Sequence, residues 1–240
     1  MIFLFTDFGE NDLYVGQLKA TIAKVDQNIL VTDLFHNAPQ FKPFSSAILL
    51  SSLLKYIPSN STVLAVVDPG VGSAQRKPVV VKTKNYVLVG PDNGLFDGID
   101  FEGAEIFEIT WRPKTLSQSF HGRDLFAPVA ALIEKGEDLQ NLCKPTNLNT
   151  LEKAKCSANS IIYIDSFGNC FSGITASSLH KDKLLISGDT RIKHANVFSD
   201  VKHGELFWYE NSIGLAEIAA NQESASEALN LKVGDRIAIK

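Results

Sequence analysis

The sequence has few cysteines, no excess of positive charge and no long hydrophobic run. Its three cysteines, Cys143, Cys156 and Cys170, are odd in number and lack a CxxC spacing. This argues against a disulfide framework or a zinc site, and we expect reduced thiols. The longest mostly apolar stretch, residues 45–57, is interrupted by serines and Lys55, so no membrane span is predicted. The formal net charge of −4, with scattered Lys and Arg, argues against a nucleic-acid partner.

Several common catalytic motifs are also missing. The sequence has no phosphate loop of the form GxxxxGK(S/T), no GxSxG and no HExxH. Gly70-Val71-Gly72 could begin a dinucleotide-binding GxGxxG, but Ser73-Ala74-Gln75 follows and breaks that pattern. These absences argue against phosphoryl transfer, serine hydrolysis and hydride transfer.

The composition is that of an ordinary globular protein, with 45% hydrophobic and 21% charged residues. Residues 1–5 are apolar, no basic region precedes them and no small-residue cleavage pattern follows them. They are therefore predicted to form a first β-strand and not a signal peptide. Together with the reduced thiols, this predicts a cytoplasmic protein.

Residues 1–145 alternate between strand-like and helix-like segments. Strands are expected near residues 3–5, 29–31, 63–67, 79–82 and 86–89, and helices over residues 13–25, 43–57 and 124–135. This alternation predicts an α/β N-terminal domain with a mainly parallel or mixed sheet covered by helices.

A polar stretch over residues 136–155, which carries Pro145 and three asparagines, is predicted to be the domain linker. After it, short strand signals recur near residues 160–164, 183–187, 205–210, 215–219 and 236–239. Residues 156–240 are therefore predicted to form a smaller, all-β, barrel-like C-terminal domain.

Four of the apolar runs end at an aspartate that opens a glycine-containing turn: Asp7, Asp68, Asp92 and Asp165. In open α/β sheets, ligands bind beyond the carboxyl ends of the strands, so these endings could place several carboxylates around one cavity. Such a cavity would suit a ligand that is rich in hydroxyls or positively charged. The alternative is that these residue types simply make good turns.

Two further groups of side chains could carry chemistry. Asp68 and Arg76 flank a tight loop and could face each other, although Arg76 could also be a surface residue. His121 lies at a predicted helix start, where a neutral imidazole could orient or deprotonate a water molecule. The alternative is that His121 only packs there. We interpret the neighbouring Asp124 as a helix cap and assign no chemistry to Arg123.

In the second domain, Asp165, Phe167 and Asn169 supply a carboxylate, an aromatic face and a carboxamide within five residues. Those groups could hold an ammonium and a heteroaromatic ring. Asn211 and Ser212 offer a hydroxyl and backbone amides suited to a carboxylate. Taken alone, each of these two segments is also a common turn.

Six motifs, in their order along the chain, resemble those of the S-adenosylmethionine hydrolase family, also called S-adenosylmethionine hydroxide adenosyltransferases and related to the fluorinase and chlorinase. The resemblance runs from Thr6 to the final strand. The motifs are Thr6-Asp7-Phe8-Gly9 with Asp12 and Tyr14-Val15-Gly16, Val67-Asp68-Pro69-Gly70-Val71-Gly72, Gly90-Pro91-Asp92-Asn93-Gly94, Phe120-His121-Gly122-Arg123-Asp124, Phe167-Gly168-Asn169 and Asn211-Ser212-Ile213-Gly214.

The resemblance implies a homotrimer in which each substrate lies between the N-terminal domain of one subunit and the C-terminal domain of its neighbour. It implies attack of water or hydroxide on the ribose 5′ carbon of S-adenosyl-L-methionine, which releases methionine and adenosine without metal or organic cofactor. By position, the family's water-activating set matches Asp68, Arg76 and His121; its ribose carboxylate matches Asp7; its methionine contacts match Asp12, Asp165 and Ser212; and its adenine contacts match Phe167, Asn169 and Asn211.

Two alternatives stay open at this stage. The first is a halide adenosyltransferase, which would form a 5′-halo-5′-deoxyadenosine. Against it, a carboxylate at Asp68 beside the nucleophile would repel chloride or fluoride. The second is a non-catalytic module that binds S-adenosylmethionine or adenosine; against it stands the intact set of Asp68, Arg76 and His121.

Overall fold

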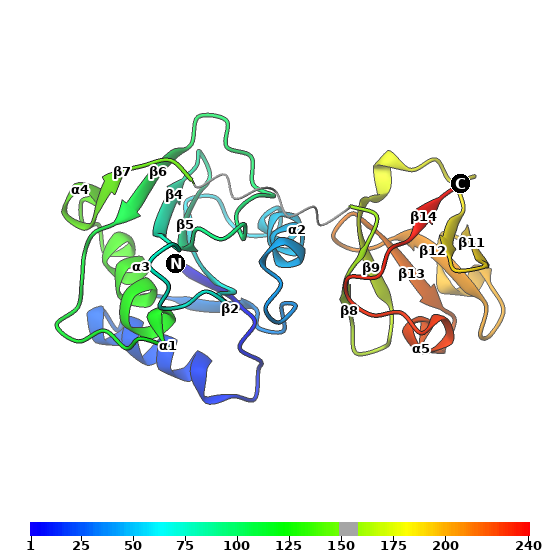
Figure 1. Cartoon of the computed structure of the whole chain (residues 1–240), viewed down its shortest axis with the longest axis horizontal. Helices are drawn as coiled ribbons and strands as arrows, with labels where there is room; N and C mark the ends of the chain where they lie inside the picture. The colour runs from blue at the N-terminus through cyan, green and yellow to red at the C-terminus, as the bar shows by residue number, and fades with distance from the viewer. Residues whose placement is uncertain (149–157) are drawn as a thin grey trace. The chain divides into compact units, whose positions relative to one another are not determined.

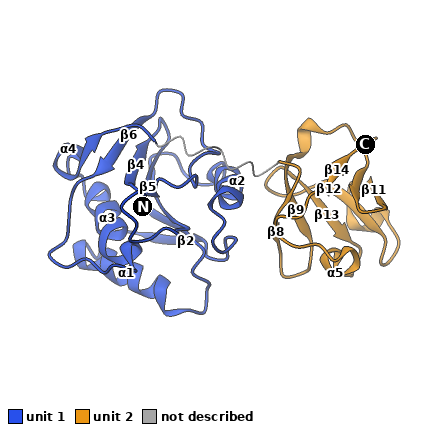
Figure 2. Cartoon of the chain, in the orientation of Figure 1, with its two compact units in different colours: residues 1–152 blue, residues 153–240 orange. Residues whose placement is uncertain are grey.

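A computed structural model describes residues 1–148 and 158–240 of the chain. The chain divides into two compact units, residues 1–152 and 153–240 (Figure 2). The last part of the predicted linker and Cys156 lie outside the described residues. Each unit is built around a sheet of its own.

The first unit holds a seven-stranded mixed sheet in the order β2-β1-β3-β5-β4-β6-β7. Parallel pairing joins β2, β1, β3 and β5, whereas β4, β6 and β7 pair in antiparallel fashion. The fully buried β1 and β3 are apolar on both faces, as central strands of a covered sheet usually are. The strands are β1 (Ile2–Thr6), β2 (Val31–Phe35), β3 (Ser61–Val66), β4 (Pro78–Lys82), β5 (Tyr86–Pro91), β6 (Glu105–Ile109) and β7 (Cys143–Pro145).

The helices of this unit are α1 (Leu13–Val25), α2 (Pro43–Leu54), α3 (Ala127–Glu134) and the single turn α4 (Leu139–Leu142). Figure 1 shows α1 and α3 on one face of the sheet and α2 on the other. Helical spacing gives α1 a buried stripe of Val15, Leu18 and Ile22, which packs in the same core as α3. Helices cover the sheet only in part, so the prediction holds in the coarser form of a mixed sheet with helices.

The order in which strands are added to this sheet changes direction at β1. The α1 crossover leads from β1 to β2 on one side, and the α2 crossover then leads to β3 on the other side of β1. The parallel neighbours β1 and β3 therefore end at the same edge, where their connections diverge. Such a switch point leaves a crevice beyond the carboxyl ends of the two strands. Asp7 follows β1 directly, and Asp68 lies two residues after β3.

The structure corrects the expectation for two segments of this unit. The predicted linker begins with ordered structure, because α4 and β7 occupy residues 139–145 and β7 pairs with β6. The helix expected over residues 124–135 begins earlier, with a π-helical turn at Gly122–Phe126 that continues into α3. Pro128 has no N–H to bond the carbonyl four residues back, which favours a wider turn at this point.

The second unit holds a curled seven-stranded sheet in the order β14-β10-β11-β12-β13-β9-β8. Its edges approach each other, since the Ile237 amide donates to the Asn159 carbonyl at 2.9 Å, which gives a half-barrel. The prediction of an all-β domain is wrong, because α5 (Ala225–Leu229) packs against β13. The strands are β8 (Ile161–Ile164), β9 (Cys170–Thr175), β10 (Leu185–Ser187), β11 (Thr190–His194), β12 (Leu206–Glu210), β13 (Leu215–Ala220) and β14 (Ala238–Ile239).

The two described cysteines are buried free thiols. Burial raises the pKa of Cys143 to about 11 and that of Cys170, which also lies near two carboxylates, to about 12. Both side chains therefore remain protonated and unreactive near neutral pH. Among the described residues, no helix is long and apolar enough to cross a membrane.

Candidate active site

A cavity of about 300 Å³ lies in the first unit, where Asp7 and Asp68 follow β1 and β3. Two carboxylates from the β1–α1 connection and one from the loop after β3 line it, together with an imidazole and four aromatic rings. These residues are Asp7, Asp12, Asp68, His121, Phe8, Tyr14, Phe41 and Phe120. The cavity is thus an acidic pocket with apolar walls, which suits a ligand that combines polar groups or positive charge with hydrocarbon surface.

Asp68, Arg76 and His121 meet at one guanidinium nitrogen. Arg76 Nη2 lies 2.7 Å from Asp68 Oδ2 and 2.9 Å from His121 Nδ1. The side chains of Asp68 and Arg76 are only 4% and 6% exposed, and the guanidinium packs over the Phe126 ring at 5.4 Å. Asp68 and His121 line the cavity, whereas Arg76 does not. Arg76 therefore positions the other two side chains without lining the cavity itself.

The Arg76 contact fixes how His121 can act. A guanidinium can only donate, so Nδ1 accepts and the neutral ring carries its proton on Nε2. Burial, followed by the positive charges of Arg76 and Arg112, lowers the pKa of His121, which keeps the ring neutral at neutral pH. The remaining ring nitrogen is therefore a hydrogen-bond donor. In this arrangement His121 can orient a small acceptor such as water but does not deprotonate it.

Asp68 has the properties of a proton acceptor. Burial raises the pKa of its carboxyl, and the charge of Arg76 opposes that rise. A hydrogen bond from the Gly70 amide also lowers the pKa of Asp68, but burial is the larger effect. A buried carboxylate whose pKa is raised accepts a proton from a bound donor more readily than an exposed carboxylate does.

Asp7 and Asp12 line the same cavity from the connection between β1 and α1. Asp7 Oδ2 accepts a hydrogen bond from the Phe41 amide at 3.1 Å, and burial raises the pKa of Asp7. Asp12 is the N-cap residue of α1, yet its side chain makes no capping hydrogen bond. Both carboxylates line the cavity and retain acceptor positions for a ligand.

A second cavity, of about 910 Å³, lies in the second unit and contains all five predicted residues of that unit: Asp165, Phe167, Asn169, Asn211 and Ser212. Asp165 Oδ1 accepts from the amides of Phe167 and Asn169, and its Oδ2 accepts from the Asn169 carboxamide at 3.0 Å. Asp165 thereby stabilises the turn and fixes the orientation of the Asn169 side chain. The Phe167 ring is 78% exposed at the cavity.

Asn211 has fewer free hydrogen-bonding groups for a ligand than its sequence position suggests. Its Oδ1 accepts from the amides of Ile213 and Leu215, and its Nδ2 donates to Glu217. Only one N–H of the carboxamide is left, so Asn211 mainly shapes the turn that carries Ser212.

The four aspartate endings differ in the cavities that they line. Asp7 and Asp68 line the cavity of the first unit, and Asp165 lines that of the second. Asp92, although buried at the end of β5, is not among the residues that line the first cavity. The strand order explains the difference, because β5 is separated from the β1 ending by β3.

Both units match models of known protein families. The model of the SAM hydroxide adenosyltransferase N-terminal domain matches residues 2–143, and that of the corresponding C-terminal domain matches residues 159–238. This chain belongs to the SAM hydroxide adenosyltransferase family. Two curated relatives are each named (R)-S-adenosyl-L-methionine hydrolase. The Thermus thermophilus protein is 32% identical, covering 97% of this chain and 96% of the relative. The Methanocaldococcus jannaschii protein is 33% identical, covering 100% and 95%.

Two solved structures share the fold of the whole chain. An uncharacterized conserved protein from Thermotoga maritima superposes with a TM-score of 0.86 at 33% identity, covering 100% of this chain and 99% of that one. A conserved hypothetical protein from Thermus thermophilus gives a TM-score of 0.81 at 32% identity, covering 100% and 99%.

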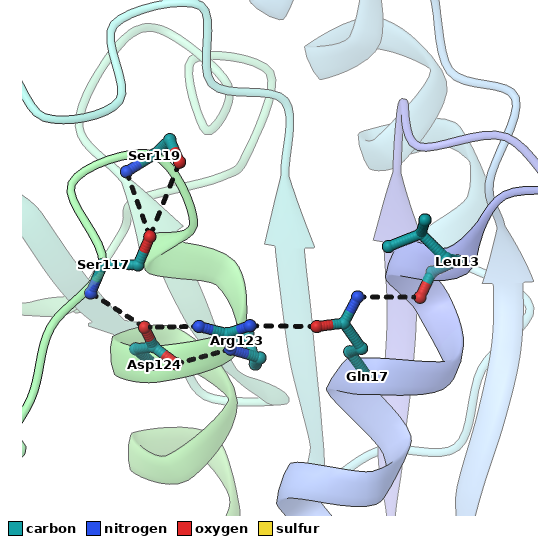
Figure 3. A network of polar contacts seen from close by, with 6 residues as sticks. All are labelled: Leu13, Gln17, Ser117, Ser119, Arg123 and Asp124. Carbon is teal, nitrogen blue, oxygen red and sulfur yellow. Dashed lines mark hydrogen bonds and ion pairs between the residues drawn. The ribbon is translucent and has the colours of Figure 1, made fainter.

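A polar network ties α1 to the segment that carries His121 (Figure 3). Arg123 contacts both oxygens of Asp124, at 2.6 and 3.0 Å, and donates to Gln17 of α1 at 2.9 Å. Asp124 also accepts from the Ser117 amide, so the prediction that it caps the helix is wrong. The network joins two walls of the cavity.

Sequence reasoning gave no role to several side chains of this family member. Phe8, Tyr14 and Phe120 form a ring cluster with centroids 5.4–5.7 Å apart on one wall of the first cavity. They occur within the quoted motifs, but aromatic residues beside turns carry no chemical signal of their own. Glu217 was also missed, although a lone glutamate in the apolar run of β13 could have drawn attention to it. Among the described residues, no group of three or more His, Cys, Asp and Glu side chains is arranged to hold a metal ion.

Proposed function

We propose that this protein hydrolyses S-adenosyl-L-methionine to adenosine and L-methionine. The observation that carries the proposal is the buried Asp68–Arg76–His121 cluster beside an acidic cavity, in a chain that matches both family domains. The names of the curated relatives support the same reaction. The acidic lining fits the substrate, whose sulfonium and ammonium groups are positive.

The reaction is a displacement at the ribose 5′ carbon. A water oxygen forms a bond to C5′, the C5′–S bond breaks, and its electron pair goes to sulfur, so methionine leaves as a neutral thioether. Because this leaving group needs no proton, the enzyme has only to hold the water in line with the C–S bond and accept its proton. Asp68 accepts that proton, the His121 Nε2–H orients the water oxygen, and Arg76 positions both side chains.

The remaining residues hold the substrate. Asp7 accepts from both ribose hydroxyls, and Asp12, Asp165 and Ser212 contact the methionine amine and carboxylate. Phe167 and Asn169 hold the adenine, with Asn211 supporting the adjoining turn. The domain bounds under this proposal are residues 1–145 and 156–240. The free buried thiols support a cytoplasmic location.

Incubation with S-adenosyl-L-methionine in oxygen-18 water tests the reaction. We expect the label in the 5′ hydroxyl of adenosine and not in methionine, as read by mass spectrometry. The reaction without enzyme is the control. Label in the methionine, or unchanged substrate, would contradict the proposal. Formation of a 5′-halo-5′-deoxyadenosine in a parallel reaction with added chloride would instead support the halide transferase.

Asp7→Ala is expected to weaken substrate binding by at least about tenfold. The parent carboxylate accepts two hydrogen bonds from the ribose, and each charge-assisted bond contributes about 1.5–3 kcal/mol. Calorimetric titration of a slow-turnover variant with substrate and with its 2′-deoxy analogue measures the loss. Asp7→Asn is the matched control, since it keeps an acceptor for the Phe41 amide. Unchanged affinity and unchanged discrimination in Asp7→Ala would remove Asp7 from the ribose site.

The proposed assembly is a homotrimer in which each substrate contacts the first unit of one subunit and the second unit of a neighbour. The division of the proposed site residues between two units supports this arrangement. Phe41 and Phe167, which line the two cavities, are 72% and 78% exposed in the single chain, as expected of rings covered by a ligand or a neighbouring subunit.

Subunit mixing tests this assembly. Asp68→Ala and Ser212→Ala chains, each inactive alone, are expected to regain activity when mixed, because some hybrid sites combine two unaltered units. The matched control mixes Asp68→Ala with His121→Ala, which alter the same unit and leave no intact hybrid site. Absence of recovery under conditions of demonstrated subunit exchange would contradict shared sites.

A further inference from the structure

Glu217 is a buried carboxylate that the proposed chemistry does not use. It is 2% exposed, yet it lines the 910 Å³ cavity of the second unit. Sheet register explains this placement, since Glu217 pairs with Phe171 on one side and Tyr209 on the other. Directly paired residues share one face of a sheet, and all three line the cavity. The flanking Ala216 and Ile218 point into the core of the second unit.

Both oxygens of Glu217 are engaged by cavity residues. The Tyr209 hydroxyl donates to Oε1 at 2.6 Å, and the Asn211 carboxamide donates to Oε2 at 3.0 Å. Burial raises the pKa of Tyr209, which keeps its hydroxyl protonated and donating. One carboxylate thus ties the ring of β12 to the turn that follows β12.

Through Asn211, the hydrogen bonds of Glu217 also stabilise a backbone turn. With its Nδ2 held by Glu217, Asn211 directs its Oδ1 at the amides of Ile213 and Leu215, at 3.1 and 2.9 Å. These bonds close the turn on which Ser212 stands. An uncharged apolar side chain at position 217 would leave a buried hydroxyl and a buried carboxamide without their acceptors, a costly arrangement that favours rearrangement of both.

We propose that Glu217 is a positioning residue that sets substrate affinity by holding Tyr209 and the Asn211–Leu215 turn in place. The proposal rests on the function proposed above for its effect on substrate. It assigns Glu217 no contact with the reacting atoms, because Asp68, Arg76 and His121 belong to the other unit. A change at Glu217 should therefore raise KM and leave kcat close to that of the parent.

The test compares Glu217→Leu, Glu217→Gln and a matched control, Ser172→Ala. Glu217→Leu removes both acceptors and is expected to raise KM by about tenfold or more, since each bond to a charged group contributes strongly. Glu217→Gln keeps one acceptor oxygen and a polar partner for the other contact, so its KM should stay within about threefold. Ser172→Ala removes a buried hydrogen bond to Ala216 in the same sheet without touching the cavity, and should keep the parental KM.

Hydrogen exchange supplies a readout that needs no substrate. In Glu217→Leu, the amides of the Asn211–Leu215 turn should exchange faster than in the parent and in Ser172→Ala. Parental KM together with parental exchange in a folded Glu217→Leu would overturn the proposal, as would a fall in kcat at unchanged KM. If Glu217→Leu does not fold, the Tyr209→Phe variant replaces it: a raised KM supports the proposal and a parental KM overturns it.

An inactive parent would refute the proposed function, whereas the exchange comparison would still test whether Glu217 holds the turn.

Discussion

Asp68→Asn is expected to lower the turnover of S-adenosyl-L-methionine by about 10²–10⁴ with little change in substrate affinity. Asparagine has nearly the same size as aspartate, but its carboxamide cannot accept the proton of the attacking water at neutral pH. The lost interaction is made mainly in the transition state, so kcat and kcat/KM should fall together. Single-turnover kinetics with mass-spectrometric detection of adenosine measures the change, and calorimetry measures the affinity.

Asp92→Asn is the matched control for this substitution. Asp92 is also a buried aspartate at the end of a strand of the same sheet, but it does not line the cavity. Turnover by Asp92→Asn should stay close to that of the parent, even if its unfolding temperature falls. Equal turnover by Asp68→Asn and the parent would show that another group handles the water.

The rate is expected to fall with decreasing pH through a pKa below the ordinary histidine value of 6.5, and to reach a plateau above it. Burial and the charges of Arg76 and Arg112 lower the pKa of His121, so the ring is neutral on the plateau. Protonation at Nδ1 breaks the bond from Arg76 and places a second positive charge beside it. Protonation of Asp68 at low pH acts in the same direction, so the acid limb contains both groups. Rates from about pH 4.5 to 8, with unfolding temperatures at each pH, test this profile.

His121 variants separate its two contacts. His121→Ala should lower turnover by about 10²–10⁴, because it removes both the acceptor for Arg76 and the donor to water. His121→Asn keeps an acceptor that can meet Arg76 but cannot titrate, so any residual activity should retain only the acid limb of Asp68. A flat profile in the parent, or normal turnover by His121→Ala with weakened binding, would make His121 a substrate contact only.

Local signals predicted most of the elements but not all of them. The helix at Leu13–Val25 has the predicted bounds, because its apolar residues recur at helical spacing along the sequence. The strands Glu105–Ile109 and Thr190–His194 were missed, since charged residues interrupt their apolar pattern and sheet partners decide their conformation. The helix Ala225–Leu229 was also missed, because five residues are too few to show a helical period.

The sequence by itself determined the family, and hence the candidate residues, because six short motifs keep their identity and order whatever the fold around them. It also determined that aspartates end strands at glycine turns. Only the tertiary structure decided which of these side chains meet. It brought Asp68, Arg76 and His121 to one guanidinium nitrogen, excluded Asp92 from their cavity and brought Glu217 into another. The physical reason is that hydrogen-bond direction, proton position and burial depend on strand order and register, which join residues far apart in the chain.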